Sequence, residues 1–581
     1  MSSLPMTMHR VLAIPELLDT VFKSMDGRSN LNNALVSRAW SEIALDTLWR
    51  QVNDLYRLFN LLAPLRIEPI SGKYEFSHPP ESSDWTRFHR YSKRVRELVY
   101  NEHKSKRKLN QSVFDDVART RISFSILPNM HTLGWSASIS LCVMFLNSNI
   151  KNFTVHIPSS IDVASSRPLL RPFFDDITAR MPDLMSLNIQ TNIPMNALEL
   201  DVVRLLESLP NLHKLILPRF CFTTRIAECV SRLSKLGCIE YHYSEEQGNG
   251  EADDIRLFKP ELSEGAFPSL WDLSLATTYD DLQRFLTIPF SPSSITMLHV
   301  ESPNIEMPGA IHQLLVAVSE NCQMLKFLAL ISRRQSFEVD PSEDQINTTR
   351  RVSMDTLKPI LACANLTSFE IIHQYPLLLQ QEDVETFATR WPSLETLNLN
   401  SEPYDLRWPK LTLEALLPFA RHCHRLSDLS IFLDASTNLI PKSSSSSPLP
   451  MFLSLNRVSM GLSKITASAP VAIFLSHLLP ITCTIDNGVT WLESFEYGPA
   501  DELVLHEELS ELWASVDDLV PTLISVRLEE RERVRWEVED LGRGVIFYQR
   551  RSLSYIVNET LYCLLDNEIL LLNVALILGD E

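Results

Sequence analysis

The chain has 581 residues, of which 45% are hydrophobic and 22% charged, as expected for a protein with a large core. Its net charge of −19 argues against nucleic acid as the main partner, because phosphate binding needs a basic face. Nine scattered cysteines without a C-x-x-C pair fit reduced thiols in the cytoplasm or nucleus. We find neither a signal peptide nor an apolar run long enough to span a bilayer, so we expect no membrane partner and a cytoplasmic or nuclear location, or both.

Residues 10–60 are predicted to form a helical domain. The first helix opens at Ile14-Pro15-Glu16, where the missing N–H of proline costs nothing, and carries apolar residues at helical spacing up to Met25. Ser29 or Asn30 can cap a second helix, and a third segment runs to Trp49. A unit below about 40 residues seldom buries such large side chains alone, so we expect a partner surface to cover them.

Four short motifs of this segment occur in the order and spacing of an F-box: Ile14-Pro15-Glu16, Val21-Phe22, Val36-Ser37-Arg38-Ala39-Trp40 and Leu48-Trp49. The segment resembles that family over about 36 residues, with Ile14 in place of the usual Leu and Ser37 where many members have Cys. The resemblance implies that the three helices dock onto a Skp-type adaptor and through it onto a cullin ubiquitin ligase. It assigns adaptor binding to Ile14, Pro15, Leu17, Leu18, Val21, Phe22, Leu31, Val36, Trp40, Leu48 and Trp49. The alternative is an ordinary helical cap on the domain that follows.

Residues 61–92 are interpreted as a linker and a capping helix. A helix is predicted from residue 51, with apolar residues from Val52 to Leu62 on one face and an end at Pro64. The Ser-, Pro- and Gly-rich stretch 71–83 reads as a linker. Asp84 can cap a further helix that carries Trp85. The basic run 103–108 fits either a solvated loop, which we favour, or a nuclear localisation signal.

From residue 93 to 540 the chain repeats an L-x-x-L-x-L frame in which any large apolar residue is allowed. Thirteen frames begin between residues 95 and 455, a mean spacing of 30 residues, and a fourteenth is plausible at Leu523-Val526-Leu528. Each frame has three apolar anchor residues, for example Leu394, Leu397 and Leu399. The first anchors of the thirteen frames are Val95, Met130, Ile150, Leu184, Leu212, Leu236, Leu270, Ile295, Leu325, Leu366, Leu394, Leu426 and Leu455. The residue three positions before the first anchor is usually apolar. Cys322, Cys363 and Cys423 occupy this position and are expected to pack as small hydrophobic residues.

This pattern predicts an α/β fold in which each frame supplies one short strand and one helical segment. Neither can bury its apolar face alone, but stacked units share a continuous core. We therefore expect an N-terminal three-helix F-box followed by an irregular leucine-rich-repeat solenoid, with a parallel sheet on the concave face and helices on the convex face. The whole chain resembles fungal F-box-like proteins with degenerate leucine-rich repeats, on the helical module, residues 83–100 and residues 507–536. Loops 243–256 and 434–449 are interpreted as surface insertions, and 541–581 is an apolar tail without a frame.

No residue pattern indicates catalysis, and we predict no enzyme activity, no cofactor and no metal. Neither a G-x-G-x-x-G loop nor a Walker-type loop is present, and in His422-Cys423-His424 the cysteine belongs to the inward-facing set. The predicted function is that of a substrate receptor of an SCF-type ubiquitin ligase, and the alternative is a leucine-rich-repeat scaffold without a ubiquitin role. An unknown target protein is expected to contact outward strand positions on the concave face: Asn188, Asp272, His299, Glu370, Thr396, Asn398, Asp428 and Ser430.

Overall fold

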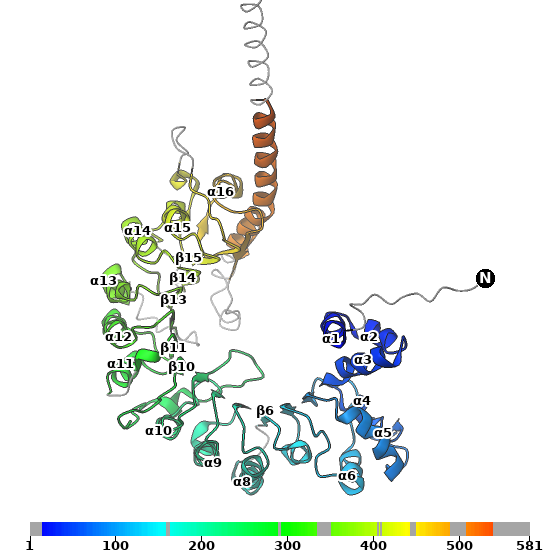
Figure 1. The fold of residues 1–581 in the computed structure, drawn as a ribbon. Coiled ribbons are helices and arrows are strands. Elements are labelled where there is room, and N and C mark those ends of the chain that lie inside the picture. Colours follow the sequence, from blue (N-terminus) through cyan, green and yellow to red (C-terminus); the bar gives the residue numbers. More distant parts are fainter. Residues whose placement is uncertain are drawn as a thin grey trace, which may run out of the picture.

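A computed structural model describes residues 14–158, 163–288, 292–333, 350–403, 406, 409–441, 449–488 and 507–537. The chain forms an arc in which strands line the inner side and helices such as α8 to α14 lie along the outer side (Figure 1). The helices are α1 Pro15–Lys23, α2 Gly27–Asn33, α3 Arg38–Arg50, α4 Leu55–Phe59, α5 Ser82–Ser92, α6 Gln111–Thr120, α7 Ile139–Cys142, α8 Val163–Arg180, α9 Met195–Glu207, α10 Thr224–Val230, α11 Tyr279–Thr287, α12 Pro308–Asn321, α13 Met354–Leu357, α14 Gln381–Arg390, α15 Leu416–His422 and α16 Ser468–Leu475. A further helix covers residues 507–537.

The strands form one large parallel sheet and two small ones. The 15-stranded sheet has the order β1-β4-β5-β6-β7-β8-β9-β10-β11-β12-β13-β14-β15-β17-β19, while β2 pairs with β3 and β16 with β18. The strands are β1 Gln51–Val52, β2 Leu65–Ile67, β3 Tyr74–Phe76, β4 Glu97–Asn101, β5 Thr132–Ser136, β6 Asn152–Ile157, β7 Ser186–Thr191, β8 Lys214–Ile216, β9 Cys238–Glu240, β10 Asp272–Ala276, β11 Met297–Ser302, β12 Phe327–Ser332, β13 Ser368–His373, β14 Thr396–Leu399, β15 Asp428–Ile431, β16 Asp434–Ala435, β17 Arg457–Gly461, β18 Lys464–Ile465 and β19 Thr484–Asn487.

The repeat frame determines the register of the large sheet, and the thirteen predicted frames coincide with β4 to β15 and β17. Equivalent anchors lie side by side, as Phe369 pairs with Leu397 and Leu397 with Leu429. These anchors are at most 1% exposed and belong to one continuous core. Each fully buried leucine contributes about 1.5–3 kcal/mol relative to an exposed one, so every frame adds stability and is itself stabilised by its neighbours.

The predicted cysteine packing is confirmed at the position three residues before the anchor. Cys322, Cys363 and Cys423 are all buried. The Cys423 thiol donates to the carbonyl oxygen of Ala388, and burial raises the pKa of this thiol to about 12. Its neighbour His422 points elsewhere and pairs with Glu385, 3.0 Å away, so the His-Cys-His sequence does not converge on one point.

Three expectations in the segment between residues 51 and 92 are wrong. The helix predicted from residue 51 is instead strand β1 followed by the short α4, because β1 pairs with β4 as the edge strand of the sheet. The predicted linker contains β3, which pairs with β2. The N-cap of α5 is Glu81, and Asp84 lies at its third position in a capping box, where it accepts from the Glu81 N–H at 2.9 Å.

The predicted fourteenth frame is also wrong. Leu523, Val526 and Leu528 lie in the helix 507–537, where Val526 and Leu528 are about half exposed. The buried stripe of that helix follows a helical period: Leu509, Trp513, Val516, Val520 and Ile524. The last strand among the described residues is β19, which the frame missed because Thr482 and Asn487 occupy two apolar positions. The apolar tail 541–581 lies outside the described residues.

Candidate interaction surfaces

The three N-terminal helices form a module with its own small core. Leu18, Phe22 and Ala44 are buried together, and the Phe22 and Trp40 rings meet edge to face with centroids 5.4 Å apart. The helix starts are capped: Asp26 accepts from the Ser29 N–H at 2.7 Å, and the Ser37 hydroxyl accepts from the Trp40 N–H at 3.3 Å. Asp26 therefore caps α2, rather than Ser29 or Asn30, and the Asn30 side chain donates to the Phe22 carbonyl at 2.8 Å.

The outer side of this module is apolar and uncovered by the rest of the described chain. Ile14, Leu17, Val21 and Met25 are spaced by three and four residues and form one stripe along α1. Each is 42–44% exposed, and beyond α1 the exposure rises to 57% at Leu31, 60% at Val36 and 86% at Leu35. Several exposed large apolar side chains within 23 residues are unusual on a monomer and typical of an interaction surface.

The residues assigned to adaptor binding divide into two groups. Ile14, Pro15, Leu17, Val21, Leu31 and Val36 are exposed, and Trp40 and Leu48 are partly exposed. Leu18, Phe22 and Trp49 are at most 7% exposed, which revises their expected role from contact to support. Leu18 and Phe22 fill the core of the module. Trp49 packs on Tyr91 at 5.3 Å and lies under the Arg57 guanidinium at 4.3 Å.

A buried arginine fixes the module to the solenoid. The side chain of Arg94, which precedes β4, is 6% exposed and forms ion pairs with the carboxylates of Glu42 and Asp46 on α3. It also donates to the Glu42 carbonyl at 3.0 Å and to the Arg90 carbonyl at 3.2 Å. The hydrogen bond from Arg94 lowers the pKa of Glu42. Module and sheet therefore form one continuous unit in which α3 leads directly into β1.

The segment after β9 crosses the carboxyl ends of the neighbouring strands. Gln247 is buried, donates to the Asn188 side-chain oxygen at 3.0 Å and to the Ile189 carbonyl at 2.9 Å, and Glu246 pairs with Lys104. Loop 243–256 is therefore anchored at several points rather than being a free surface insertion. Lys104 belongs to the basic run 103–108, which is a loop after β4.

The three expected concave contact residues on β7, β10 and β11 are engaged by other parts of the chain. The Asn188 side chain is held by Gln247, and His299 Nε2 lies 2.9 Å from the Tyr243 hydroxyl. Burial, with a smaller contribution from Arg219, lowers the pKa of His299 to about 4. Asp272 is buried against Cys238 and Glu240.

The cluster around Asp272 is the one group of ligand-type side chains in the described residues that could hold a metal. Cys238, Glu240 and Asp272 offer atoms within 4.8 Å of one another. Lys214 Nζ already lies 2.7 Å from Glu240, so the chain supplies its own cation. Burial raises the pKa of Asp272 to about 6, helped by the Glu240 charge. Burial alone would also raise the pKa of Glu240, but hydrogen bonds from Cys238, Lys214 and His242 lower it to about 2.

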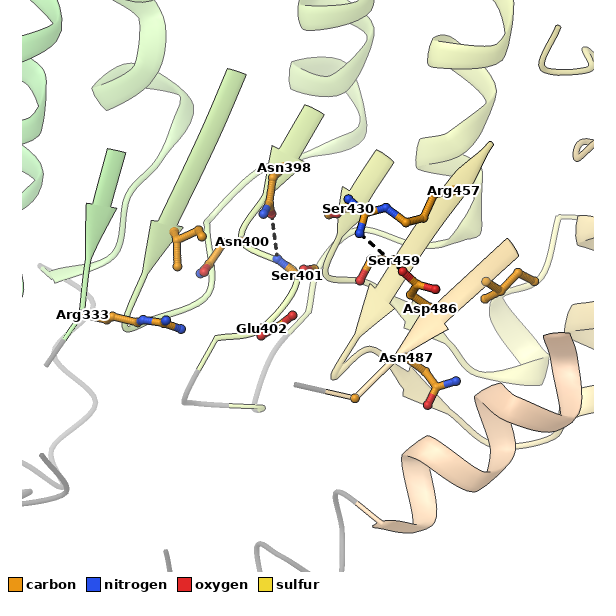
Figure 2. A pocket seen from close by; sticks show the side chains of 13 residues that line it. Arg333, Asn398, Asn400, Ser401, Glu402, Ser430, Arg457, Ser459, Asp486 and Asn487 are labelled. Atoms are coloured by element: carbon orange, nitrogen blue, oxygen red, sulfur yellow. Dashed lines mark hydrogen bonds and ion pairs between the residues drawn. The ribbon is translucent and has the colours of Figure 1, made fainter. Parts of the chain in front are cut away.

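The other five expected contact residues lie on three adjacent strands, β13 to β15, next to a polar cavity of about 430 Å³. Figure 2 shows its lining side chains on the side of the sheet away from the helices. The lining residues are Arg333, Ile372, Asn398, Asn400, Ser401, Glu402, Ser430, Arg457, Ser459, Ile485, Asp486, Asn487 and Gly488. Asn398 and Ser430 belong to the expected set, and Glu370 pairs in register with Asn398. Thr396 and Asp428 pair with each other and lie two residues before Asn398 and Ser430 on the same strands.

The backbone after β14 shapes one wall of this cavity. Asn400 has a positive φ of 55°, a conformation that asparagine tolerates better than most residues. Its side chain accepts from the His373 N–H at 3.0 Å and donates to the Tyr375 carbonyl at 2.9 Å, which ties β14 to β13. On the opposite wall Arg457 pairs with Asp428 at 3.0 Å and with Asp486 at 3.5 Å. The repeat pattern could have identified Arg457 and Ser459, which flank the predicted anchor Val458, but not Asp486.

A parallel sheet that gains one strand with each frame of about 30 residues defines the class of fold as a leucine-rich-repeat-type solenoid. No protein-family model matches the chain, and no curated protein matches it. Among the solved structures that match is the crystal structure of a TLR13–ssRNA13 complex, at 12% identity and a TM-score of 0.27. The alignment covers 70% of this chain and 58% of that chain, so the chain spans less than two thirds of its neighbour. The fold assignment rests on the strand order and register described above.

Among the described residues no helix combines the length and the apolar character needed to cross a membrane.

Proposed function

We propose that this protein is a substrate receptor of an SCF-type ubiquitin ligase, located in the cytoplasm or nucleus. The N-terminal module binds a Skp-type adaptor, which joins it to a cullin, and the concave face of the solenoid holds a target protein. The observation that carries the proposal is the uncovered stripe Ile14, Leu17, Val21 and Met25 on a module whose sequence resembles an F-box. The chain performs no bond chemistry in this role: it brings a target close to the ligase and raises its effective concentration.

The adaptor interface is tested by co-precipitation of the full chain with a purified Skp-type adaptor. The double variant Leu17→Glu/Val21→Glu changes side chains that are each 42% exposed, so folding should be preserved while two charges enter the apolar surface. We expect the adaptor to be lost. The matched control Leu200→Glu/Leu257→Glu adds the same charge at positions 65% and 86% exposed and should retain it. An adaptor that fails to bind the unaltered chain, or that binds the double variant equally well, contradicts the proposal.

A scaffold without a ubiquitin role is the second candidate, and the tight attachment of the module favours it. Trp49, Val52 and Phe59 belong to the core of the solenoid, so helices α3 and α4 act as a cap whatever else they do. For the same reason a truncation at residue 60 would destabilise the solenoid under either function. Surface variants in the full chain discriminate the two: a scaffold predicts that Leu17→Glu/Val21→Glu leaves the lifetime of every bound protein unchanged.

A further inference from the structure

The concave face carries a carboxylate that has no partner among the described residues. Glu370 lies on β13 between Ala329 on β12 and Asn398 on β14, in register with both. Its side chain is partly buried, and the described residues offer it neither a hydrogen bond nor an ion pair. Burial raises the pKa of Glu370, and the positive charge of Arg457 only partly opposes this shift of the pKa. A half-buried charge without a partner costs free energy in the isolated protein, and a bound cation would relieve that cost.

A second polar group of the same strand face also lacks a partner. The Ser368 side chain is 9% exposed, and its hydroxyl makes no hydrogen bond among the described residues. Ser368 and Glu370 are two residues apart and therefore face the same side of the sheet. On the next two strands the Thr396 and Ser430 hydroxyls likewise have no side-chain partner in the part of the chain that the structure describes. An uncompensated carboxylate thus lies beside a row of free hydroxyl groups.

The charges around the cavity favour a cation over an anion. Four carboxylates line or border it, those of Glu370, Glu402, Asp428 and Asp486, against the two guanidiniums of Arg333 and Arg457. Arg457 is already bound by two of the carboxylates. An anionic ligand at Arg457 would have to displace these contacts, whereas a guanidinium or ammonium group can use Glu370 and the neighbouring oxygens directly. An arginine side chain has five N–H donors, so it can bind a carboxylate and the adjacent hydroxyl and amide oxygens at the same time.

We propose that the concave surface of β13 to β19 binds a basic polypeptide segment of the target protein, with one arginine or lysine side chain seated on Glu370. This inference rests on the proposed function, because it specifies the partner of the same concave face. The polar cavity beyond Asn398 accommodates the residues that follow the anchoring side chain (Figure 2). The remainder of the sheet contributes less, because loop 243–256 already binds outward side chains there. Its Gln247 contacts Asn188 on β7, and its Tyr243 contacts His299 on β11.

Fluorescence anisotropy with three labelled peptides tests the proposal on the full chain. The peptides alternate serine with arginine, with glutamine or with glutamate, so that they share length and spacing and carry positive, no or negative side-chain charge. We expect the arginine peptide to bind and the other two to bind at least tenfold more weakly. The variant Glu370→Gln should weaken the arginine peptide about tenfold, as expected for loss of one charge-assisted contact. The control Glu320→Gln, on an exposed site of α12, removes the same charge and should leave affinity unchanged.

Two results would overturn the proposal. Equal weakening by Glu370→Gln and Glu320→Gln would mean that the peptide responds only to the overall charge of −19. Preferential binding of the glutamate peptide would mean that the cavity selects anions through Arg333 and Arg457. Neither result affects the proposed adaptor interface, which is retained if the Leu17→Glu/Val21→Glu variant loses the adaptor as expected. Conversely, a failed adaptor test with a positive Glu370 result retains the basic-segment site and removes the ligase.

Discussion

Arg94 and Glu42 lie 52 residues apart in the sequence and form an ion pair that joins the solenoid to the helical module. The arginine side chain is 6% exposed and the glutamate side chain 58% exposed, so the cation is buried while its partner remains in contact with water. The cost of burying this guanidinium is offset by two carboxylates and two backbone carbonyls.

Replacing Arg94 by Met should loosen this junction. We expect a loss of about 1–3 kcal/mol in the free energy of unfolding, because several charge-assisted hydrogen bonds disappear. The control Arg90→Met removes a 61% exposed arginine that is 3.8 Å from Glu42 and should cost less than about 0.5 kcal/mol. Urea titration measures both. Equal, small effects would show that Arg94 does not hold the module.

The same pair predicts a dependence on pH. Because the pKa of Glu42 is lowered in the folded protein, the ion pair contributes stability above the ordinary pKa of glutamate, and this contribution is lost as the pH falls through the lowered value. The difference in stability between the wild type and Arg94→Met should therefore be largest near neutral pH and shrink in acid. Urea titrations at pH 7 and below pH 4 measure this difference, and a difference that grows in acid contradicts the assignment.

Asp272 should show the opposite sign. Its pKa is raised to about 6, so the folded state favours the neutral carboxyl group and loses stability as the pH rises through 6. Asp272→Asn should therefore stabilise the protein by about 1–3 kcal/mol at pH 7.5 and by less at pH 4.5, where the folded protein keeps this carboxyl group protonated. Thermal melts at the two pH values measure this. A larger gain at pH 4.5 would show that Lys214 keeps Asp272 ionised throughout.

The register of the sheet can be tested at two adjacent residues of β14. Leu397 is fully buried, and its replacement by Ala should cost about 2–5 kcal/mol because a cavity remains in the core. Asn398 faces the concave cavity, and its replacement by Ala should change stability by no more than about 0.5 kcal/mol, since the one hydrogen bond of its side chain among the described residues comes from the Ser401 N–H at 3.4 Å. Comparable melting temperatures for the two variants would contradict the register.

Gly248 should be essential for anchoring loop 243–256. Its φ is +77°, and a Cβ there would lie 2.1 Å from the Thr191 carbonyl oxygen. Gly248→Ala should detach the loop and accelerate proteolysis within 243–256. Gly265→Ala is a matched control, because Gly265 has a φ of +78° but nothing within 4 Å of a Cβ. Equal proteolysis of both variants would mean that backbone strain alone, not the contact with β7, determines the effect.

The strands were predictable because each frame must present apolar residues to one shared core. Leu397 and Leu429 occupy equivalent places, and a repeated constraint leaves a repeated pattern. The two end strands were not predictable in the same way. β1 has only two residues, and β19 needs fewer apolar residues because the helix 507–537 covers it: Asp517 accepts from the Ile485 N–H at 2.8 Å.

The candidate sites were predictable only in part. On α1 the apolar pattern contains two stripes one residue apart, Leu17 with Val21 and Leu18 with Phe22, and periodicity does not determine which one faces outward. On the concave face, alternation identified Glu370 and Asn398 as outward residues. It could not reveal that Gln247, from a loop without any periodic pattern, would bind Asn188, or that Cys238 and Glu240 would bury Asp272.

The continuous sheet also sets the distance between the helical module and Glu370. From β1, which is joined directly to the module, to β13, which carries Glu370, the strand order contains ten intervals. At about 4.8 Å each, they separate the two ends by about 50 Å along the inner arc. Under the proposed function, a protein bound to the module and a protein bound at Glu370 would thus be kept at a set distance and orientation. Insertion or deletion of one repeat between them would change both the distance and the orientation.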